Sequence, residues 1–135
     1  MSFVKYRIRD VATDLGLAPK EIAADFLQRC GADGIISPRP TLIRRGRELG
    51  VLTVLRVFAL DSKAVSNLRS ETESGNPDMV EILPGTLPRV MARLRSELKI
   101  PLLAGGLLEE KSDILSALSA GALCVSASDS RLWDM

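Results

Sequence analysis

Short apolar runs alternate with longer amphipathic segments along most of the chain. Five times, a run rich in Val, Ile and Leu ends in Ser, Asp, Gly or Pro and is followed by a segment with helical periodicity. A sixth unit is predicted at the start, with a strand in residues 3–10 and a helix in residues 19–31. The five later strands are predicted in residues 32–38, 51–62, 78–85, 100–106 and 122–130, and the segments that follow them are residues 41–50, 63–75, 87–98, 109–121 and 131–135.

The predicted strands are almost continuous apolar runs, which is typical of strands that are covered on both faces. Repeated strand–helix–strand units imply parallel strands joined by right-handed crossovers. Both a (β/α) barrel and an open doubly wound sheet fit this pattern, and a complete barrel takes about 250 residues. The predicted fold class is therefore α/β and TIM-barrel-like, an incomplete barrel of about six strand–helix units with parallel strands.

Length and composition agree with one domain, predicted to span residues 1–135. The chain has 135 residues, of which 46% are hydrophobic and 26% are charged, as in ordinary globular proteins. No apolar run approaches the roughly 18 residues of a membrane span, and the first residues lack a signal-peptide pattern, so a cytoplasmic location is predicted. The formal net charge of +1 does not by itself indicate a partner.

The carboxyl ends of the last two predicted strands consist of small residues. Gly105 and Gly106 end one strand, and Ser126 and Ser128 end the other. Ligands bind at this end of parallel strands in both architectures, and in barrels the loops after the last two strands often hold a phosphate. Glycines expose backbone N–H groups, serines add hydroxyl donors, and a helix N-terminus behind the glycines offers unpaired donors to an anion. A phosphate-type ligand is therefore predicted here, with a plain Gly-Gly turn as the alternative.

Four residues of other predicted strands are candidates for the same ligand site. Ser37 and Gly85 end two earlier predicted strands. Arg56 and Glu81 each place a charge inside an otherwise apolar strand, where a charge is costly unless it is paired or faces solvent. A structural Arg–Glu pair or an exposed strand face explains these two charges as well as a place in the ligand pocket does. Both alternatives stay open, and both residues are kept as ligand candidates.

No catalytic constellation appears in the sequence. The chain has no histidine, which removes the usual general base and the commonest metal ligand, and no metal-ligand spacing is present. Cys30 and Cys124 are interpreted as small buried residues of a protein in a reducing compartment. No catalytic residue, metal or cofactor is predicted.

Two of the predicted helices carry clustered arginines. Arg44, Arg45 and Arg47 belong to one, and Arg89 and Arg93 to the other. A solvated outer helix face explains such clusters, and contact with nucleic-acid phosphates is the alternative. Interleaved aromatic residues for base stacking are absent, so the charge pattern alone does not predict RNA binding.

Several long motifs, in order, resemble the glycerol uptake operon antiterminator proteins of bacteria. They are "ADGIISPRPTLIRRGRELG", "LTVLRVFALDS", "PDMVEILPGTLPRV", "IPLLAGGL" and "AGALCVSASDSRLWDM". The resemblance implies a barrel-like fold, no catalytic turnover, and a regulator that binds glycerol 3-phosphate and acts on leader mRNA so that transcription passes a terminator. It also implies that the phosphate lies at Gly105, Gly106, Ser126 and Ser128, and it gives the arginine clusters weight as RNA contacts.

The chain departs from this family near its start. By this resemblance, the chain is expected to lack the first two strand–helix units of the family, and Thr13 and Asp14 stand where the family tends to have Glu and Gly. The predicted function is a transcription antiterminator that regulates glycerol uptake and metabolism genes. The alternatives are a phosphate-binding TIM-barrel isomerase or lyase acting on a small sugar phosphate, and a barrel remnant that only forms a homo-oligomer.

Overall fold

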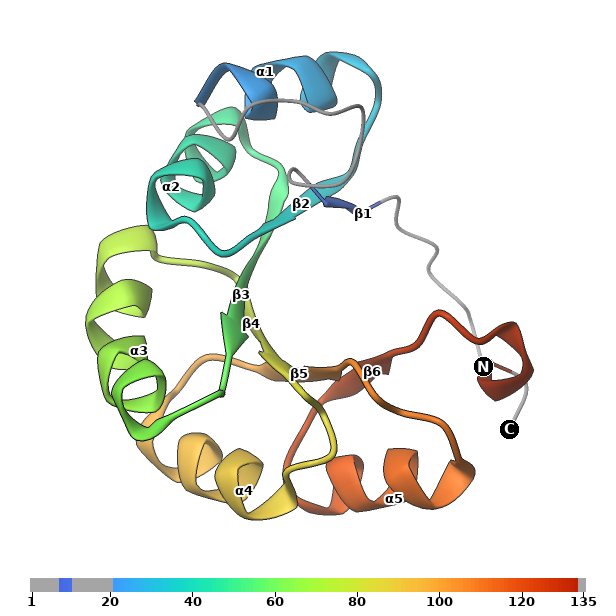
Figure 1. Cartoon of the computed structure of the whole chain (residues 1–135). Coiled ribbons are helices and arrows are strands. Elements are labelled where there is room, and N and C mark those ends of the chain that lie inside the picture. The colour runs from blue at the N-terminus through green and yellow to red at the C-terminus, as the bar shows by residue number, and fades with distance from the viewer. Residues whose placement is uncertain (1–7, 11–20, 134–135) are drawn as a thin grey trace. The chain divides into compact units, whose positions relative to one another are not determined.

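The computed structural model describes residues 8–10 and 21–133, and it confirms the predicted alternation of strands and helices (Figure 1). The rest of the predicted first unit lies outside the described residues. The strands are β1 (Ile8–Asp10), β2 (Gly34–Ser37), β3 (Leu52–Phe58), β4 (Met79–Leu83), β5 (Leu102–Gly105) and β6 (Cys124–Ser126). The helices are α1 (Glu21–Arg29), α2 (Pro40–Leu49), α3 (Ser62–Gly75), α4 (Pro88–Glu97), α5 (Lys111–Ser119) and the short 3₁₀ helix η2 (Ser130–Leu132).

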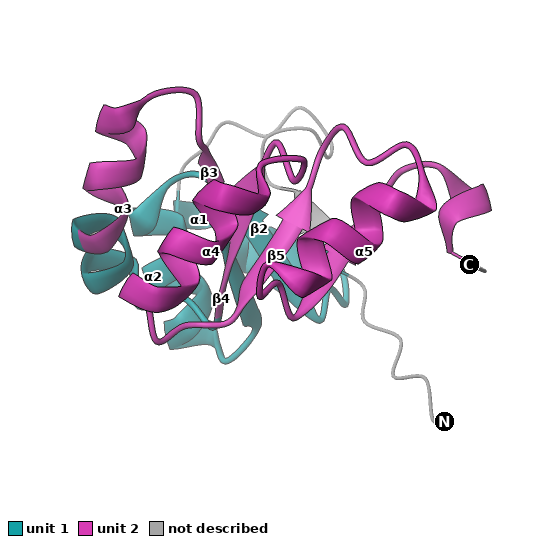
Figure 2. Cartoon of the chain, turned by 90° about the horizontal axis from the view of Figure 1, so that it is seen from below, with its two compact units in different colours: residues 1–55, 70–78 teal, residues 56–69, 79–135 magenta. Residues whose placement is uncertain are grey.

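The chain divides into two compact units, coloured separately in Figure 2. The first comprises residues 1–55 and 70–78, and the second comprises residues 56–69 and 79–135. In the first unit β1 pairs with β2 and β2 with β3, and in the second β4 pairs with β5 and β5 with β6. All four pairings are parallel, as the strand–helix repeat predicts.

The first unit packs α1 and α2 around β2. Ala23, Ala24 and Leu27 form the buried stripe of α1 and share a core with Ile35 of β2 and Leu42 of α2. The spacing of the three α1 residues places them on one helix face, which explains why this segment buries one side only.

Both ends of α2 follow from its sequence. Pro40 occupies the first turn, where its missing N–H costs nothing. Gly50 follows the helix with φ +75°, a left-handed conformation that favours glycine, and its N–H donates to the carbonyl of Arg47.

The second unit is built on β4, β5 and β6. Val80 and Ile82 of β4 and Leu102 and Ala104 of β5 are fully buried, as their continuous apolar runs predict. Met91 is one of the buried residues of α4, which packs on β5. Because these strands are parallel, the loops after β4, β5 and β6 all leave the same edge of the unit.

Among the described residues, no helix is both long enough and apolar enough to cross a membrane.

Candidate functional site

The glycine turns after β4 and β5 are joined by hydrogen bonds. The backbone N–H of Gly85 donates to the carbonyl oxygens of Gly105, at 2.5 Å, and Gly106, at 3.1 Å. A Cβ on Gly85 would lie 3.0 Å from the backbone nitrogen of Gly105, closer than side chains ordinarily pack. The structure therefore brings together three of the candidate residues, and the two turns approach this closely because Gly85 has no side chain.

A buried carboxylate lies beside these turns. Arg56 Nε donates to Glu81 Oε2 at 2.8 Å, and Ser126 Oγ donates to Glu81 Oε1 at 2.8 Å. The side chain of Glu81 is 3% exposed and that of Arg56 is 20% exposed. The ion pair, one of the two alternatives drawn from the sequence, is present, and the role of these residues toward a ligand stays a prediction.

Gly105 makes room for this network. A Cβ on Gly105 would lie 2.7 Å from Ser126 Oγ and still closer to Glu81 Oε1. The first glycine of the pair is therefore required by the side chains of β4 and β6, and not only by the turn that follows. Because Gly105 and Ser126 are partners in the parallel register, this packing is a direct consequence of the β5–β6 pairing.

The chain after Gly105 turns through two left-handed residues. Gly106 has φ +72° and Leu107 has φ +56°, an uncommon conformation for leucine. Within residues 8–10 and 21–133, no hydrogen bond uses the backbone N–H of either residue. These two donors are therefore available to a ligand at the glycine turn.

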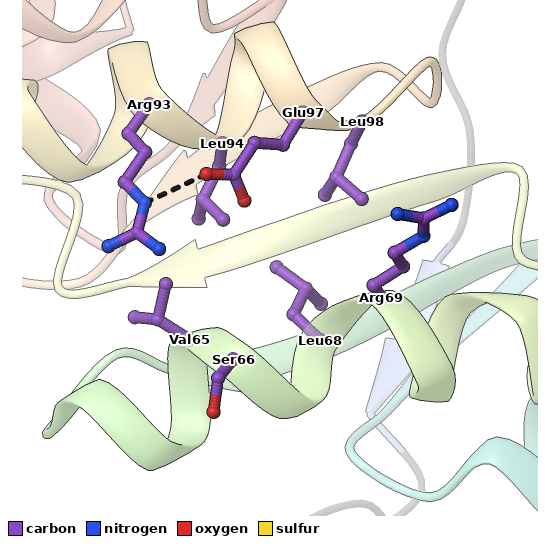
Figure 3. Close-up of a pocket in the computed structure, with 8 residues that line it drawn as sticks. All are labelled: Val65, Ser66, Leu68, Arg69, Arg93, Leu94, Glu97 and Leu98. Carbon is purple, nitrogen blue, oxygen red and sulfur yellow. Dashed lines mark hydrogen bonds and ion pairs between the residues drawn. The ribbon is translucent and has the colours of Figure 1, made fainter.

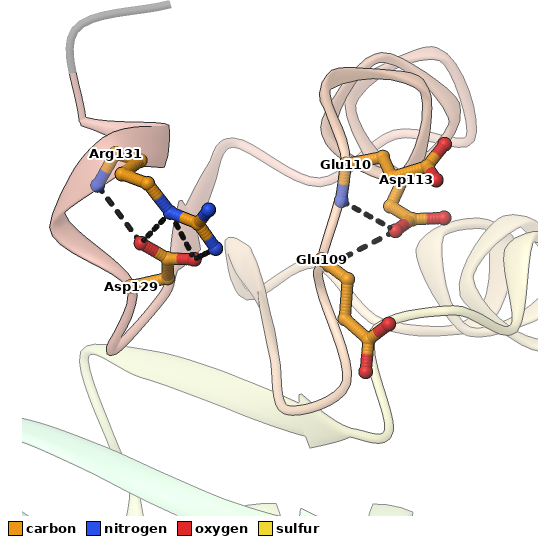
Figure 4. Close-up of polar contacts among 5 residues, drawn as sticks. All are labelled: Glu109, Glu110, Asp113, Asp129 and Arg131. Carbon is orange, nitrogen blue, oxygen red and sulfur yellow. Dashed lines mark hydrogen bonds and ion pairs between the residues drawn. The ribbon is translucent and has the colours of Figure 1, made fainter.

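The N-terminus of α5 is capped in part by a side chain of the helix itself. The N–H groups of Glu109 and Glu110 donate to Asp113 Oδ2 at 3.0 and 2.9 Å (Figure 4). These hydrogen bonds hold the pKa of Asp113 below its usual range. Asp113 therefore takes two donors that lie just before the helix, whereas the N–H groups of Lys111 and Ser112 in its first turn have no hydrogen-bond partner among the described residues.

The loop after β6 is held by its own side chains. Trp133 Nε1 donates to the carbonyl of Ala127 at 2.9 Å. Asp129 accepts from the backbone N–H and the guanidinium of Arg131 (Figure 4), and the guanidinium holds the pKa of Asp129 below its usual range. Ser128 is exposed, and no described residue hydrogen-bonds to its side chain.

A surface cavity of about 460 Å³ borders this loop. Ser126 lines this cavity, and its hydroxyl also donates to Glu81 Oε1. The cavity is lined by Ile114, Val125, Ser126, Ala127, Leu132 and Trp133.

Ser37 lies in the first unit, at the end of β2. It is buried, and its Oγ accepts from the backbone N–H of Arg39 at 3.2 Å. Its part in a ligand site stays a prediction.

The two cysteines differ in their surroundings. Cys124 is half-buried in β6, and burial, together with the nearby negative charge of Glu81, raises the pKa of its thiol. Cys30 is exposed just after the end of α1, so its predicted burial is wrong. The apolar pattern of α1 ends one turn before it, which explains the difference. No group of three or more metal-ligating side chains lies together in the described part of the chain.

Two arginines of α2 are neutralised by carboxylates of the first unit. Arg45 contacts Asp25 of α1 through Nη2 at 2.7 Å and Nε at 3.0 Å, and Glu48 through Nη1 at 2.8 Å. This two-point contact with Arg45 lowers the pKa of Asp25. Arg47 forms an ion pair with Asp78.

The other arginines fall into two groups. Arg44 donates to the backbone and side chain of Ser74, and Arg93 pairs with Glu97 at 2.9 Å on the rim of a groove of about 350 Å³ (Figure 3). Arg89 is exposed, and no side-chain partner for it exists among the described residues. The groove is lined by Val65, Ser66, Leu68 and Arg69 of α3 and by Arg93, Leu94, Glu97 and Leu98 of the α4 segment.

Sequence reasoning missed the carboxylates that neutralise or cap these elements. Asp113 was detectable, because it stands three residues after Glu110 at the start of a predicted helix, the spacing of a capping box. The roles of Asp25 and Asp78 could not be detected in the sequence, because their partners are distant along the chain. Asp78 binds both the N–H and the hydroxyl of Thr53, at 2.9 and 3.1 Å.

Comparison with known proteins identifies the family of this chain. A family model described as glycerol-3-phosphate responsive antiterminator matches residues 7–133. The chain is 33% identical over 132 residues to the uncharacterized protein YgcP of Escherichia coli (strain K12), covering 97% of this chain and 69% of YgcP.

Solved structures agree with the family model. The chain is similar to the glycerol uptake operon antiterminator regulatory protein of Listeria monocytogenes str. 4b F2365, with 32% identity and a TM-score of 0.85 over 93% of this chain and 68% of that one. It is also similar to a glycerol uptake operon antiterminator-related protein of Thermotoga maritima MSB8, with 35% identity and a TM-score of 0.83 over 95% and 73%. A likeness of fold alone to the aldolase QR15 (16% identity, TM-score 0.71, 87% and 66% covered) confirms the predicted TIM-barrel-like α/β class.

Proposed function

The chain belongs to the glycerol-3-phosphate responsive antiterminator family, and from this premise we propose that it is a transcription antiterminator for glycerol uptake and metabolism genes. It binds leader mRNA in response to glycerol 3-phosphate, so that transcription passes a terminator. The observation that carries the proposal is the family match over residues 7–133, which includes both loops of the candidate site. Because the target is a nascent bacterial transcript, the protein acts in the cytoplasm.

The effector binds at the loops after β5 and β6, at Gly105, Gly106, Ser126 and Ser128. Free backbone N–H groups at Gly106 and Leu107 support a phosphate at this turn, since a phosphate needs several donors and the N–H groups of Glu109 and Glu110 already bind Asp113. The remaining candidates are Gly85, the Arg56–Glu81 pair and Ser37. Gly85 donates its N–H to the carbonyls of Gly105 and Gly106, and Arg56 and Glu81 form an ion pair beside this turn.

Glycerol 3-phosphate changes RNA binding only if it binds one conformation better than another. The coupling is reciprocal, so RNA raises the affinity for glycerol 3-phosphate by the same factor. A coupling of about 1–3 kcal/mol, the usual range, corresponds to a change of RNA affinity of about 5- to 150-fold.

RNA binding with and without the effector tests the regulatory half of the proposal. The affinity for a terminator-containing leader RNA is measured by titration, in buffer alone and with millimolar glycerol 3-phosphate. We expect tighter binding with the effector and a clear dependence on salt concentration. An RNA affinity that glycerol 3-phosphate leaves unchanged contradicts the proposed regulation.

Thermal unfolding tests the effector half independently of RNA. A ligand present at 100 times its Kd stabilises the folded state by about 2.7 kcal/mol. We expect the melting temperature to rise with glycerol 3-phosphate and to respond less to glycerol alone. Identical melting curves with and without millimolar glycerol 3-phosphate would exclude it as the effector.

A further inference from the structure

The proton of the Ser126 hydroxyl is already used inside the protein. Ser126 Oγ lies 2.8 Å from Glu81 Oε1, and an ionised carboxylate only accepts hydrogen bonds, so Ser126 is the donor. A hydroxyl has one proton and two lone pairs. What Ser126 still offers to a ligand is therefore acceptor capacity.

Arg56 keeps Glu81 in the accepting state. Its Nε donates to Glu81 Oε2 at 2.8 Å, and a guanidinium has donors only. With a side chain 3% exposed, Glu81 has little water to replace either partner. Both carboxylate oxygens are thus committed as acceptors, one to Arg56 and one to Ser126.

The two hydrogen-bonded side chains pack closely against the backbone of Gly105. Gly105 has no Cβ at the position where one would collide with both Ser126 Oγ and Glu81 Oε1. Ser126 itself is only half-buried and borders the cavity of about 460 Å³ after β6. The acceptor side of Ser126 is therefore the part of the network that a ligand can reach.

From these contacts we infer that Ser126 recognises a hydroxyl group of the ligand and not its phosphate, and that Glu81 is the positioning residue that imposes this choice. The inference rests on the proposed function, because the site is the one assigned to glycerol 3-phosphate. The ligand then lies with its phosphate at the free N–H groups of Gly106 and Leu107 and with a glycerol hydroxyl donating to Ser126. The site selects phosphorylated polyols over phosphate esters that lack hydroxyls.

The same arrangement predicts what reverses the direction of this hydrogen bond. In Glu81→Gln, the carboxamide oxygen turns toward Arg56, since Arg56 only donates, and the NH₂ group then faces Ser126. Ser126 becomes an acceptor toward residue 81, and its proton is released for the ligand. Glu81→Gln therefore converts the same hydroxyl into a donor, which can bind a ligand ether oxygen that the wild-type hydroxyl cannot bind.

The test compares two ligands on the full chain. Kd is measured by calorimetry for glycerol 3-phosphate and for n-propyl phosphate, which has the same phosphate and no free hydroxyl. We expect the wild-type chain to prefer glycerol 3-phosphate about tenfold, equivalent to about 1.4 kcal/mol and the size of one hydrogen bond. Ser126→Ala removes that preference and leaves the Kd of n-propyl phosphate unchanged. In a separate arm, the wild-type chain binds 2-methoxyethyl phosphate, whose ether oxygen only accepts hydrogen bonds, no better than n-propyl phosphate, and Glu81→Gln binds it more tightly than the wild type does. Ser116→Ala, an exposed serine-to-alanine change on α5, leaves both Kd values unchanged.

The outcomes separate this inference from the proposed function. If Ser126→Ala weakens both ligands by the same factor, Ser126 binds the phosphate, and the inference is overturned while the proposed effector stands. If the wild-type chain binds both ligands equally, the polyol selectivity does not exist. If it binds neither, the proposed effector falls and the inference falls with it. Should Glu81→Gln fail to fold, as judged by circular dichroism, the Ser126→Ala ratio alone decides.

Discussion

At the scale of single residues, Gly105 carries the most information about the site. Its missing side chain makes room for the Ser126–Glu81 hydrogen bond, because a Cβ there would meet both Ser126 Oγ and Glu81 Oε1. Gly106 is needed for a different reason, since its φ of +72° favours glycine. The two adjacent glycines are therefore required for different reasons, Gly105 for close packing and Gly106 for its backbone conformation.

Gly105→Ala should destabilise the protein and disturb the site together. The new Cβ collides with Ser126 Oγ, and overpacking of this kind costs about 1–3 kcal/mol. Urea unfolding measures the loss, with Gly75→Ala as the matched control, because a Cβ there would meet its nearest neighbours at 3.3 Å and should change stability by less than about 1 kcal/mol. A Gly105→Ala variant as stable as the wild type would show that β5 and β6 are not packed as described.

At the scale of elements, the strand–helix units follow from local sequence. Continuous apolar runs became buried parallel strands, and Gly50 ends α2 as its position after a periodic segment predicts. The start of α5 depends on Asp113, which the sequence analysis did not single out. Its carboxylate takes the N–H groups of Glu109 and Glu110 and leaves those of Lys111 and Ser112 without a partner among the described residues.

Asp113→Ala should lower the melting temperature in a pH-dependent way. The folded-state pKa of Asp113 lies below its ordinary value, so its contribution is complete above the unfolded-state pKa of about 3.9 and is lost as the pH falls through the folded-state value. The difference in melting temperature between wild type and variant should therefore be largest near pH 7 and should shrink below about pH 4. Melting curves at several pH values measure it, and a difference that stays constant down to pH 3 would contradict the capping role.

At the scale of the whole molecule, the arginines that look alike in the sequence divide by their partners. Arg45 and Arg47 are paired with carboxylates, and Arg93 is paired with Glu97. Such pairs leave little net charge for RNA phosphates, whereas Arg44 is bonded to the neutral Ser74 and Arg89 is exposed without a side-chain partner among the described residues. We therefore predict Arg89 as an RNA contact. Net charge along the chain therefore overstates the basic surface of α2.

Arg89→Ala and Arg45→Ala should differ in what they change. Arg89→Ala should weaken binding of leader RNA and reduce the slope of log affinity against log salt by about one, without changing the melting temperature. Arg45→Ala should lower the melting temperature, because Asp25 loses its partner, and should leave the salt slope unchanged. Titration of RNA at several salt concentrations, beside melting curves, compares the two. Equal loss of salt slope in both variants would place α2 in the RNA interface after all.

The sequence by itself determined the alternation of strands and helices, the parallel pairing and the family, because these depend on local periodicity and on long motifs. It also placed small residues at the ends of β5 and β6. Only the tertiary structure decided how the charges and hydroxyls are used: Glu81 pairs with Arg56 and Ser126, and Asp113 accepts from the N–H groups of Glu109 and Glu110. Hydrogen-bond partners depend on the register and packing of strands that are distant along the chain. Glu81 and Ser126, 45 residues apart, meet only because β5 lies between their strands with a glycine at the point of contact.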